Sequence, residues 1–291
     1  MTRGQFIQRS VLAGIGFTVF KPGSPWDKLL KSEMKFGLVT YQWGKDWDLP
    51  TLISNCEKTG FHGVELRTQH AHHVETSLNT SQRNDVKKRF ADSSVVCVGY
   101  GSNFEFHSPD PKILRQNIDQ TKEYIRLCKD IGASGIKVKP NGLPKEVTKE
   151  KTIAQIAASL NEIGKYASDF GLKVRLEVHG PLTQELPNIK AIMEQVNEPN
   201  VKICWNSNDT DLLPPGLEAN FASVKKWIGD TVHIRELGMT EYPYPQLFKL
   251  LAGNNYNGWI LLEASSEPKD RIAAMKDQVS LFNQMLSEMN K

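Results

Sequence analysis

The 291-residue chain has few cysteines and no charge excess in its body. Its four cysteines are too scattered for a disulfide framework or a CxxC metal site, and we interpret them as buried free thiols. There are 36 basic and 33 acidic residues, and residues 1–23 hold three basic residues and no acid, so the rest of the chain is neutral. A neutral body argues against a nucleic-acid-binding surface, which needs concentrated basic charge.

The chain also has no hydrophobic run of membrane-spanning length. Arg3 and Arg9 precede an uncharged stretch, residues 10–20, which would span about 16 Å as a helix against a hydrocarbon core of about 30 Å. This length excludes a stable membrane anchor, and the pattern is typical of a signal peptide. Residues 2–7 resemble a twin-arginine export signal in which Gly4 replaces the second arginine.

We therefore expect three parts in the chain: a signal-like segment at residues 1–23, a linker at 24–33 and a catalytic domain at 34–291. Export to the periplasm is the predicted destination. The alternative is a cytoplasmic enzyme whose N-terminus is a short amphipathic segment.

From Met34 onward, short apolar runs alternate with longer amphipathic ones. Eight strands are predicted, at residues 35–42, 63–67, 95–101, 135–140, 173–179, 201–206, 231–236 and 259–263. They begin about every 30 residues, which is the size of one strand–helix unit. Eight such units in about 250 residues predict an α/β fold, a single-domain (β/α)8 TIM barrel. The alternative, a doubly wound open sheet, usually has a Gly-rich phosphate turn after its first strand, and residues 39–44 do not form one.

Charged residues alternate with apolar ones along these strands. Glu177 and His179 share one face of residues 173–179, whereas Val174, Leu176 and Val178 share the other. Parallel strands are covered by helices on the outside, so the charged faces point to the barrel axis. Late positions lie at the carboxyl ends of strands, where barrel enzymes carry their chemistry. In this chain they are Arg67, Lys139, Glu177, His179, Asn206, His233 and Glu263.

Two carboxylates and two imidazoles among these residues form a candidate metal site. The set is Glu177, His179, His233 and Glu263, and Asn206 adds a neutral oxygen. Mixed oxygen and nitrogen donors suit one divalent ion and do not select among Mn²⁺, Co²⁺, Zn²⁺, Fe²⁺ and Mg²⁺.

The segments 175–180, 201–206, 232–236 and 262–263 resemble the sugar phosphate isomerase/epimerase superfamily, the xylose isomerase-like TIM barrels. The resemblance covers about residues 35–290. It implies Glu177, Asn206, His233 and Glu263 as metal ligands. The family usually has Asp at the position of Asn206, so one ligand charge is missing, and His179 is then an additional ligand candidate.

Further polar groups follow the earlier strands and are candidates for substrate contacts. Aromatic and polar residues in the loop that ends at His107 suit a sugar ring, and Lys139 can place an ammonium on a substrate oxyanion. The predicted substrate-binding residues are Arg67, His70, His72, His107, Lys139, Asn208 and Arg235.

The function expected from the resemblance is a metal-dependent sugar isomerase or epimerase, in which Glu177 and Glu263 move a proton next to a carbonyl. The same first step allows a lyase or dehydratase that expels a β-substituent. Two other readings are an inactive sugar-binding barrel and cleavage of damaged DNA, which the neutral body disfavours. The expected partner is a small carbohydrate, with no nucleic acid and no membrane anchor. The sequence leaves open whether the chain forms a homo-oligomer.

Overall fold

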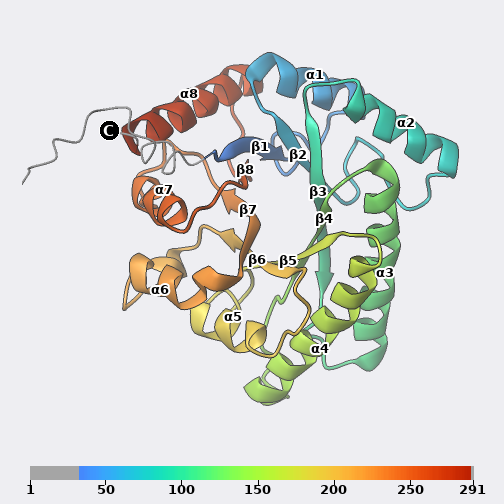
Figure 1. Ribbon diagram of the computed structural model, residues 1–291, viewed down its shortest axis with the longest axis vertical. Coiled ribbons are helices and arrows are strands. Elements are labelled where there is room, and N and C mark those ends of the chain that lie inside the picture. The colour runs from blue at the N-terminus through green and yellow to red at the C-terminus, as the bar shows by residue number, and fades with distance from the viewer. Residues whose placement is uncertain (1–32, 290–291) are drawn as a thin grey trace, which may run out of the picture. The chain divides into compact units, whose positions relative to one another are not determined.

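Each of the eight predicted strand–helix units forms in the computed structural model, which describes residues 33–289 (Figure 1). The strands pair in parallel and in chain order, and β1 pairs with β8 to close the barrel. The prediction of a single (β/α)8 domain is therefore confirmed. The signal-like segment and residues 24–32 of the linker lie outside the described residues.

The strands are short and lie within a few residues of their predicted positions. They are β1 (Lys35–Val39), β2 (Gly63–Arg67), β3 (Val96–Glu105), β4 (Gly135–Lys139), β5 (Lys173–Glu177), β6 (Val201–Asn206), β7 (Ile228–Ile234) and β8 (Trp259–Leu262). The largest differences are that β3 continues four residues further than the apolar runs predict, that β1 ends three residues earlier, and that β7 begins three residues earlier.

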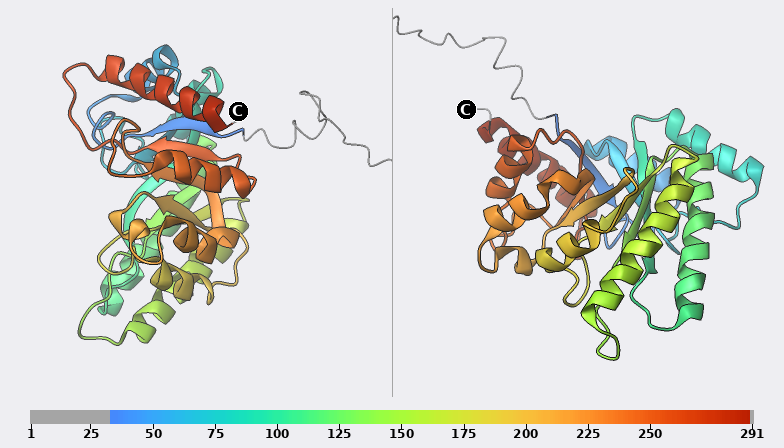
Figure 2. Two further views of the ribbon diagram at one scale, coloured as in Figure 1. Left: turned by 90° about the vertical axis from the view of Figure 1, so that its left-hand side faces the viewer. Right: turned by 60° about the horizontal axis from the view of Figure 1, so that its bottom comes forward.

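Eight α-helices follow the strands and form the outer layer of the described barrel (Figures 1 and 2). They are α1 (Leu49–Thr59), α2 (Thr80–Ala91), α3 (Pro111–Ile131), α4 (Lys149–Ser168), α5 (Leu186–Met193), α6 (Leu217–Val224), α7 (Tyr244–Gly253) and α8 (Arg271–Met289). The last helix, α8, packs against both α7 and α1, so the helical layer closes as the sheet does. Within residues 33–289, none of the helices combines the length and the apolar character needed to cross a bilayer.

Local hydrogen bonds and left-handed glycines set the helix ends. Asp48 caps α1 by accepting a hydrogen bond from the backbone N–H of Thr51, and Gly60 ends it with φ 85°. Asp110 and Gly132 bound α3 in the same way. The last helix begins at Arg271, where the Asp270 side chain caps it by accepting a hydrogen bond from the N–H of Ala273.

Apolar residues on the outer face of the strands make the main core under the helices. Val64, Leu66, Val174 and Leu176 are fully buried there. The opposite faces of the same strands carry Glu65, Lys137, Arg175 and Glu177 into the barrel, as the alternation predicts. The barrel interior is therefore filled largely by charged side chains.

Two glycines of β3 make room for these long side chains. A Cβ at Gly99 would lie 2.4 Å from the Arg175 guanidinium, and one at Gly101 would lie 2.5 Å from Glu65 Oε1. Arg175 occupies the lower layer of the barrel, where it makes two hydrogen bonds to Asp230, of 2.9 and 3.0 Å. This ion pair stabilises the lower part of the barrel. Glu65 lies nearer the carboxyl ends of the strands.

Candidate active site

Three strands bring Glu177, His233 and Glu263 together at the carboxyl end of the barrel. One donor atom from each lies within 4.8 Å of the others. The sequence predicts this convergence, since all three residues stand at the inward-facing ends of β5, β7 and β8. Glu177 and His233 are buried, and the Glu263 side chain is 15% exposed.

The donor spacing fits a divalent metal ion. His233 Nδ1 lies 3.2 Å from Glu177 Oε1 and 3.5 Å from Glu263 Oε2. Ligands about 2.1 Å from a tetrahedral ion lie about 3.4 Å from one another. Two carboxylates and an imidazole are also the donor types that such an ion takes from proteins.

Glu65 lies behind His233 on the side away from these carboxylates. Its Oε1 is 3.1 Å from His233 Nε2, and both residues are fully buried. Within the described residues, neither Glu65 oxygen has a hydrogen-bond donor in good geometry, and His233 Nε2 has no acceptor in good geometry. A proton on Nε2 that faces Glu65 would leave the Nδ1 lone pair directed at the metal position. Glu65 is not among the site residues predicted from the sequence, although strand alternation directs it into the barrel.

Glu177 is held by the side chains of Lys137, Asn206 and His233. Its Oε2 accepts a hydrogen bond of 2.6 Å from Lys137, which is itself fully buried, and its Oε1 accepts one of 3.3 Å from Asn206 Nδ2. Burial alone would raise the pKa of Glu177, but Lys137 and His233 hold it well below its usual value. Glu177 is therefore an ionised carboxylate whose oxygens are already engaged.

Glu263 differs from Glu177 because it opens onto a pocket. Arg67 donates to Glu263 Oε1 at 2.8 Å and to Asn103 Oδ1 at 2.9 Å. Burial works to raise the pKa of Glu263, yet the contact with His233 holds it below its usual value. Of the two predicted acid/base residues, Glu263 is the more accessible.

The pocket above the cluster has a volume of about 310 Å³, at the lower end for small-ligand sites. Of the predicted residues, it is lined by Arg67, Lys139, His179, Asn206, Asn208 and Arg235, together with Glu263. Tyr41, Gln184 and Ser265 complete the wall, and sequence reasoning missed them because they lie in loops. Predicted site residues from the carboxyl ends of six strands thus meet at one pocket.

His179 lines this pocket but lies outside the three-residue donor cluster. Its Nδ1 is 2.7 Å from Asn141 Oδ1, and Asn141 in turn donates to Glu105 Oε1 at 2.5 Å. Burial lowers the pKa of His179, so the ring is neutral near pH 7. The geometry makes His179 a pocket side chain, and the structure places Asn206 closer to the cluster.

The other predicted histidines lie away from the pocket wall. Both ring nitrogens of His72 face the backbone, at 2.8 Å from Arg67 O and 3.0 Å from Val74 N, so none remains for a substrate. His70 Nδ1 is 3.1 Å from Thr40 Oγ1, and His107 Nδ1 is 3.6 Å from Glu105 Oε2. None of the three rings lines the mouth pocket, and their role as substrate contacts stays a prediction from the sequence.

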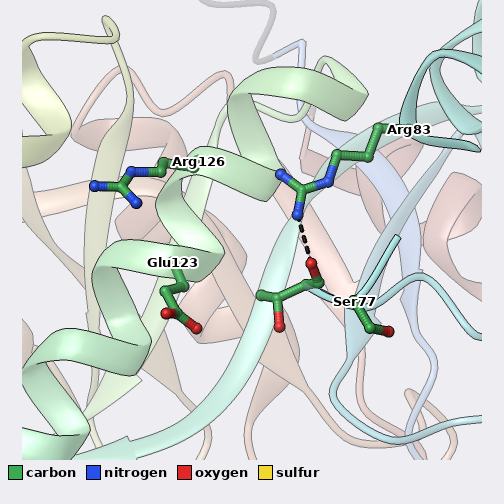
Figure 3. A pocket seen from close by; sticks show the side chains of 5 residues that line it. Ser77, Arg83, Glu123 and Arg126 are labelled. Atoms are coloured by element: carbon green, nitrogen blue, oxygen red, sulfur yellow. Dashed lines mark hydrogen bonds between the residues drawn. The ribbon is translucent and has the colours of Figure 1, made fainter. Parts of the chain in front are cut away.

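A second pocket of about 350 Å³ lies between α2, α3 and the loop before α2 (Figure 3). Arg83 points into it but is held by the carbonyl oxygens of Thr76 and Leu78 and by Asp130. The remaining wall consists of Ser77, Glu123 and Arg126, and none of the predicted site residues lies there. The predicted site residues are therefore gathered at the barrel mouth and not at this second pocket.

Comparisons with known proteins identify the family and the fold. The sequence profile of the xylose isomerase-like TIM barrels matches residues 53–210. Inosose dehydratase 1 of Bacillus cereus is 23% identical over 289 residues, which cover 82% of this chain and 92% of that protein.

Two solved structures share the fold. The 3-keto-D-glucoside 4-epimerase of E. coli has a TM-score of 0.73 at 15% identity, and it covers 86% of this chain and 99% of its own. The IOLI protein with a bound zinc atom has a TM-score of 0.72 at 17% identity, with coverages of 88% and 99%.

Proposed function

The chain belongs to the family of xylose isomerase-like TIM barrels, and on this basis we propose that it is a sugar isomerase or epimerase that moves a proton beside a carbonyl group. The observation that carries the proposal is the convergence of Glu177, His233 and Glu263 at the floor of a sugar-sized pocket. Sugar epimerases of this fold, and a relative with bound zinc, support it.

Glu177, His233 and Glu263 would hold one divalent ion, with Asn206 beside them. When bound, this ion would supply Lewis-acid polarisation of the substrate carbonyl. Lys137 keeps Glu177 ionised and in place, and Glu65 orients His233. The barrel wall around the cluster excludes bulk water, because Glu65, Lys137, Glu177 and His233 are all buried.

Proton transfer falls first to Glu263, which is ionised and faces the pocket. Its carboxylate takes a proton from the carbon next to the carbonyl. Return of the proton to the neighbouring carbon gives an isomer, and return to the opposite face of the same carbon gives an epimer. The second of these needs a proton donor on the other side of the substrate. We assign this position to Glu177, which would pass on a proton from the Lys137 ammonium that hydrogen-bonds its Oε2 at 2.6 Å.

A dehydratase is the second candidate function. The Bacillus cereus relative is an inosose dehydratase. Loss of a β-hydroxyl after the same proton abstraction would give this activity. The two candidates share the first step and differ only in where the reaction ends.

The test follows deuterium uptake from D₂O into a panel of ketoses, inososes and keto-glycosides, with added Mn²⁺ or Co²⁺. Uptake detects the shared proton abstraction. Product analysis then separates an isomer or epimer, which keeps the mass of the substrate, from a dehydration product, which has lost one water. No exchange with any member of the panel, in metal-loaded protein, would contradict the proposal.

The matched variants are Glu263→Gln and Glu177→Gln, which keep an oxygen ligand but remove the proton acceptor. We expect exchange to fall by about 10²-fold or more in each, since a general base contributes that much. Metal content, measured by elemental analysis, should fall less than activity. Exchange at the wild-type rate in either variant would refute the acid/base assignment of that residue.

A further inference from the structure

The wall of the mouth pocket carries more positive than negative charge. Arg67, Lys139 and Arg235 line it, against a single carboxylate, Glu263. Arg67 already forms the 2.8 Å ion pair with Glu263. Two cations therefore remain without a counterion in the wall.

Lys139 is the deeper of these two cations. It ends β4, its residue is only 9% exposed, and its ammonium forms no hydrogen bond or ion pair with the described residues. Burial and the neighbouring Lys137 lower the pKa of Lys139, which shows the cost of this placement. The charges of Glu177 and Glu263 work to raise the pKa of Lys139, so its ammonium lies within electrostatic reach of the carboxylate cluster.

Arg235 lies at the exposed rim, two residues beyond His233. Its backbone N–H donates to Tyr244 at 2.8 Å, but its guanidinium has no carboxylate or carbonyl partner among the described residues. The forked guanidinium is the side chain best matched to a carboxylate, because it donates two parallel hydrogen bonds.

The other carboxylates near the mouth do not neutralise these cations. Glu236 accepts hydrogen bonds from the backbone of Ser265 and Ser266, and Glu105 accepts one from Asn141. Neither of them lines the pocket. A divalent ion held by the three-residue cluster would increase the positive excess further.

The rest of the wall is neutral and polar, which suits a hydroxylated ligand. Tyr41, Gln184, Asn206, Asn208 and Ser265 offer hydrogen-bonding groups around the same space. The volume of about 310 Å³ corresponds to a monosaccharide rather than a polymer. A sugar whose only polar groups are hydroxyls would leave the Arg235 guanidinium without an anionic partner.

We propose that the substrate is a sugar acid, with its carboxylate at the end remote from the reacting carbonyl and bound there by Arg235. Lys139 faces the reacting end and stabilises the negative charge that develops on the carbonyl oxygen when the proton leaves. This inference rests on the proposed function for the reaction, but the binding of the carboxylate is independent of turnover.

The experiment measures binding by titration calorimetry with two pairs of ligands, D-tagatose with D-tagaturonate and D-fructose with D-fructuronate. The members of each pair differ only at C6, where the neutral ketose has a hydroxymethyl group and the uronate has a carboxylate. We expect the full-length protein to bind at least one uronate about 10-fold more tightly than its neutral partner, as a charge-assisted hydrogen bond provides. The preference should shrink as NaCl is added.

Arg235→Gln should abolish this preference while the affinity for the neutral ketose changes little. Arg235→Lys should restore part of it, because the charge returns without the fork. Arg89→Gln is the matched control, since Arg89 is exposed on α2 outside the pocket and should keep the full preference. Equal affinities within both pairs, undetectable uronate binding, or an unchanged preference in Arg235→Gln would overturn the proposal.

D-tagatose 6-phosphate distinguishes the kind of anion. Tighter binding of the phosphate than of the uronate would overturn the carboxylate assignment. Deuterium exchange is measured separately, so a failure of the proton-transfer proposal would appear as absent exchange with uronate binding intact.

Discussion

At the scale of single residues, the site depends on a few charged side chains that are buried inside the barrel. Glu65 is the clearest example, because it is fully buried and lies 3.1 Å from His233 Nε2. Its oxygens have no other hydrogen-bond donor in the described chain. A buried carboxylate of this kind is costly unless it orients a neighbouring group.

Glu65→Gln tests this role while keeping the side-chain volume. We expect metal affinity to fall by about 10- to 100-fold, the effect typical of removing a group that orients a ligand histidine. Competition with a chelating dye measures the affinity, and circular dichroism verifies the fold. Wild-type metal affinity in a folded Glu65→Gln protein would show that His233 is oriented by something else.

At the scale of elements, β3 is the strand that gives space to its neighbours. Its inward positions Gly99 and Gly101 lie against Arg175 and Glu65, so any side chain there would displace a charged group. The strand alternation that predicts inward charges on β2 and β5 thus depends on inward glycines between them.

Gly101→Ala should destabilise the protein by about 1–3 kcal/mol, the usual cost of overpacking a filled interior. Urea unfolding measures the change. Gly253→Ala is the control, because a Cβ at the end of α7 meets nothing within 4 Å. That control should be neutral or slightly stabilising, since alanine suits a helix better than glycine. Equal effects of the two substitutions would contradict the packing argument.

The loop after β6 contains a buried acid that makes stability depend on pH. Asp211 accepts hydrogen bonds from Tyr242 and from the N–H of Asn208, yet burial raises the pKa of Asp211 to about 7. A folded-state pKa above the unfolded value means that Asp211 contributes its full stability below about pH 4. The contribution is lost as the pH rises towards 7.

Asp211→Asn should remove this dependence. Its free energy of unfolding relative to wild type should increase by up to about 1.4 kcal/mol per pH unit between pH 4 and 7. Unfolding curves of both proteins at several pH values measure the difference. A difference that stays constant over this range would show that Asp211 is ionised in the folded protein throughout.

At the scale of the whole molecule, the barrel is complete within the described residues, because β1 and β8 pair and α8 packs against α1. The signal-like residues 1–23 and most of the linker remain predictions from the sequence. We propose that they direct export rather than contribute to the fold.

A chain expressed from residue 24 should fold with unchanged stability but remain in the cytoplasm, whereas the full chain should reach the periplasm. Thermal unfolding and cell fractionation measure the two properties. An insoluble truncated chain would contradict the signal and linker assignments. Cytoplasmic retention of the full chain would contradict export.

The sequence by itself determined the eight strand–helix units and the inward face of each strand, because side chains alternate with a period of two and each helix carries its own end signals. It also located Glu177, His233 and Glu263, since strand ends converge in a closed barrel. Only the tertiary structure decided that the rings of His70, His72 and His107 do not line the mouth pocket. It alone also brought Glu65 next to His233. Loop geometry and side-chain contacts between distant strands have no periodic signal in the sequence, and therefore only the folded chain shows them.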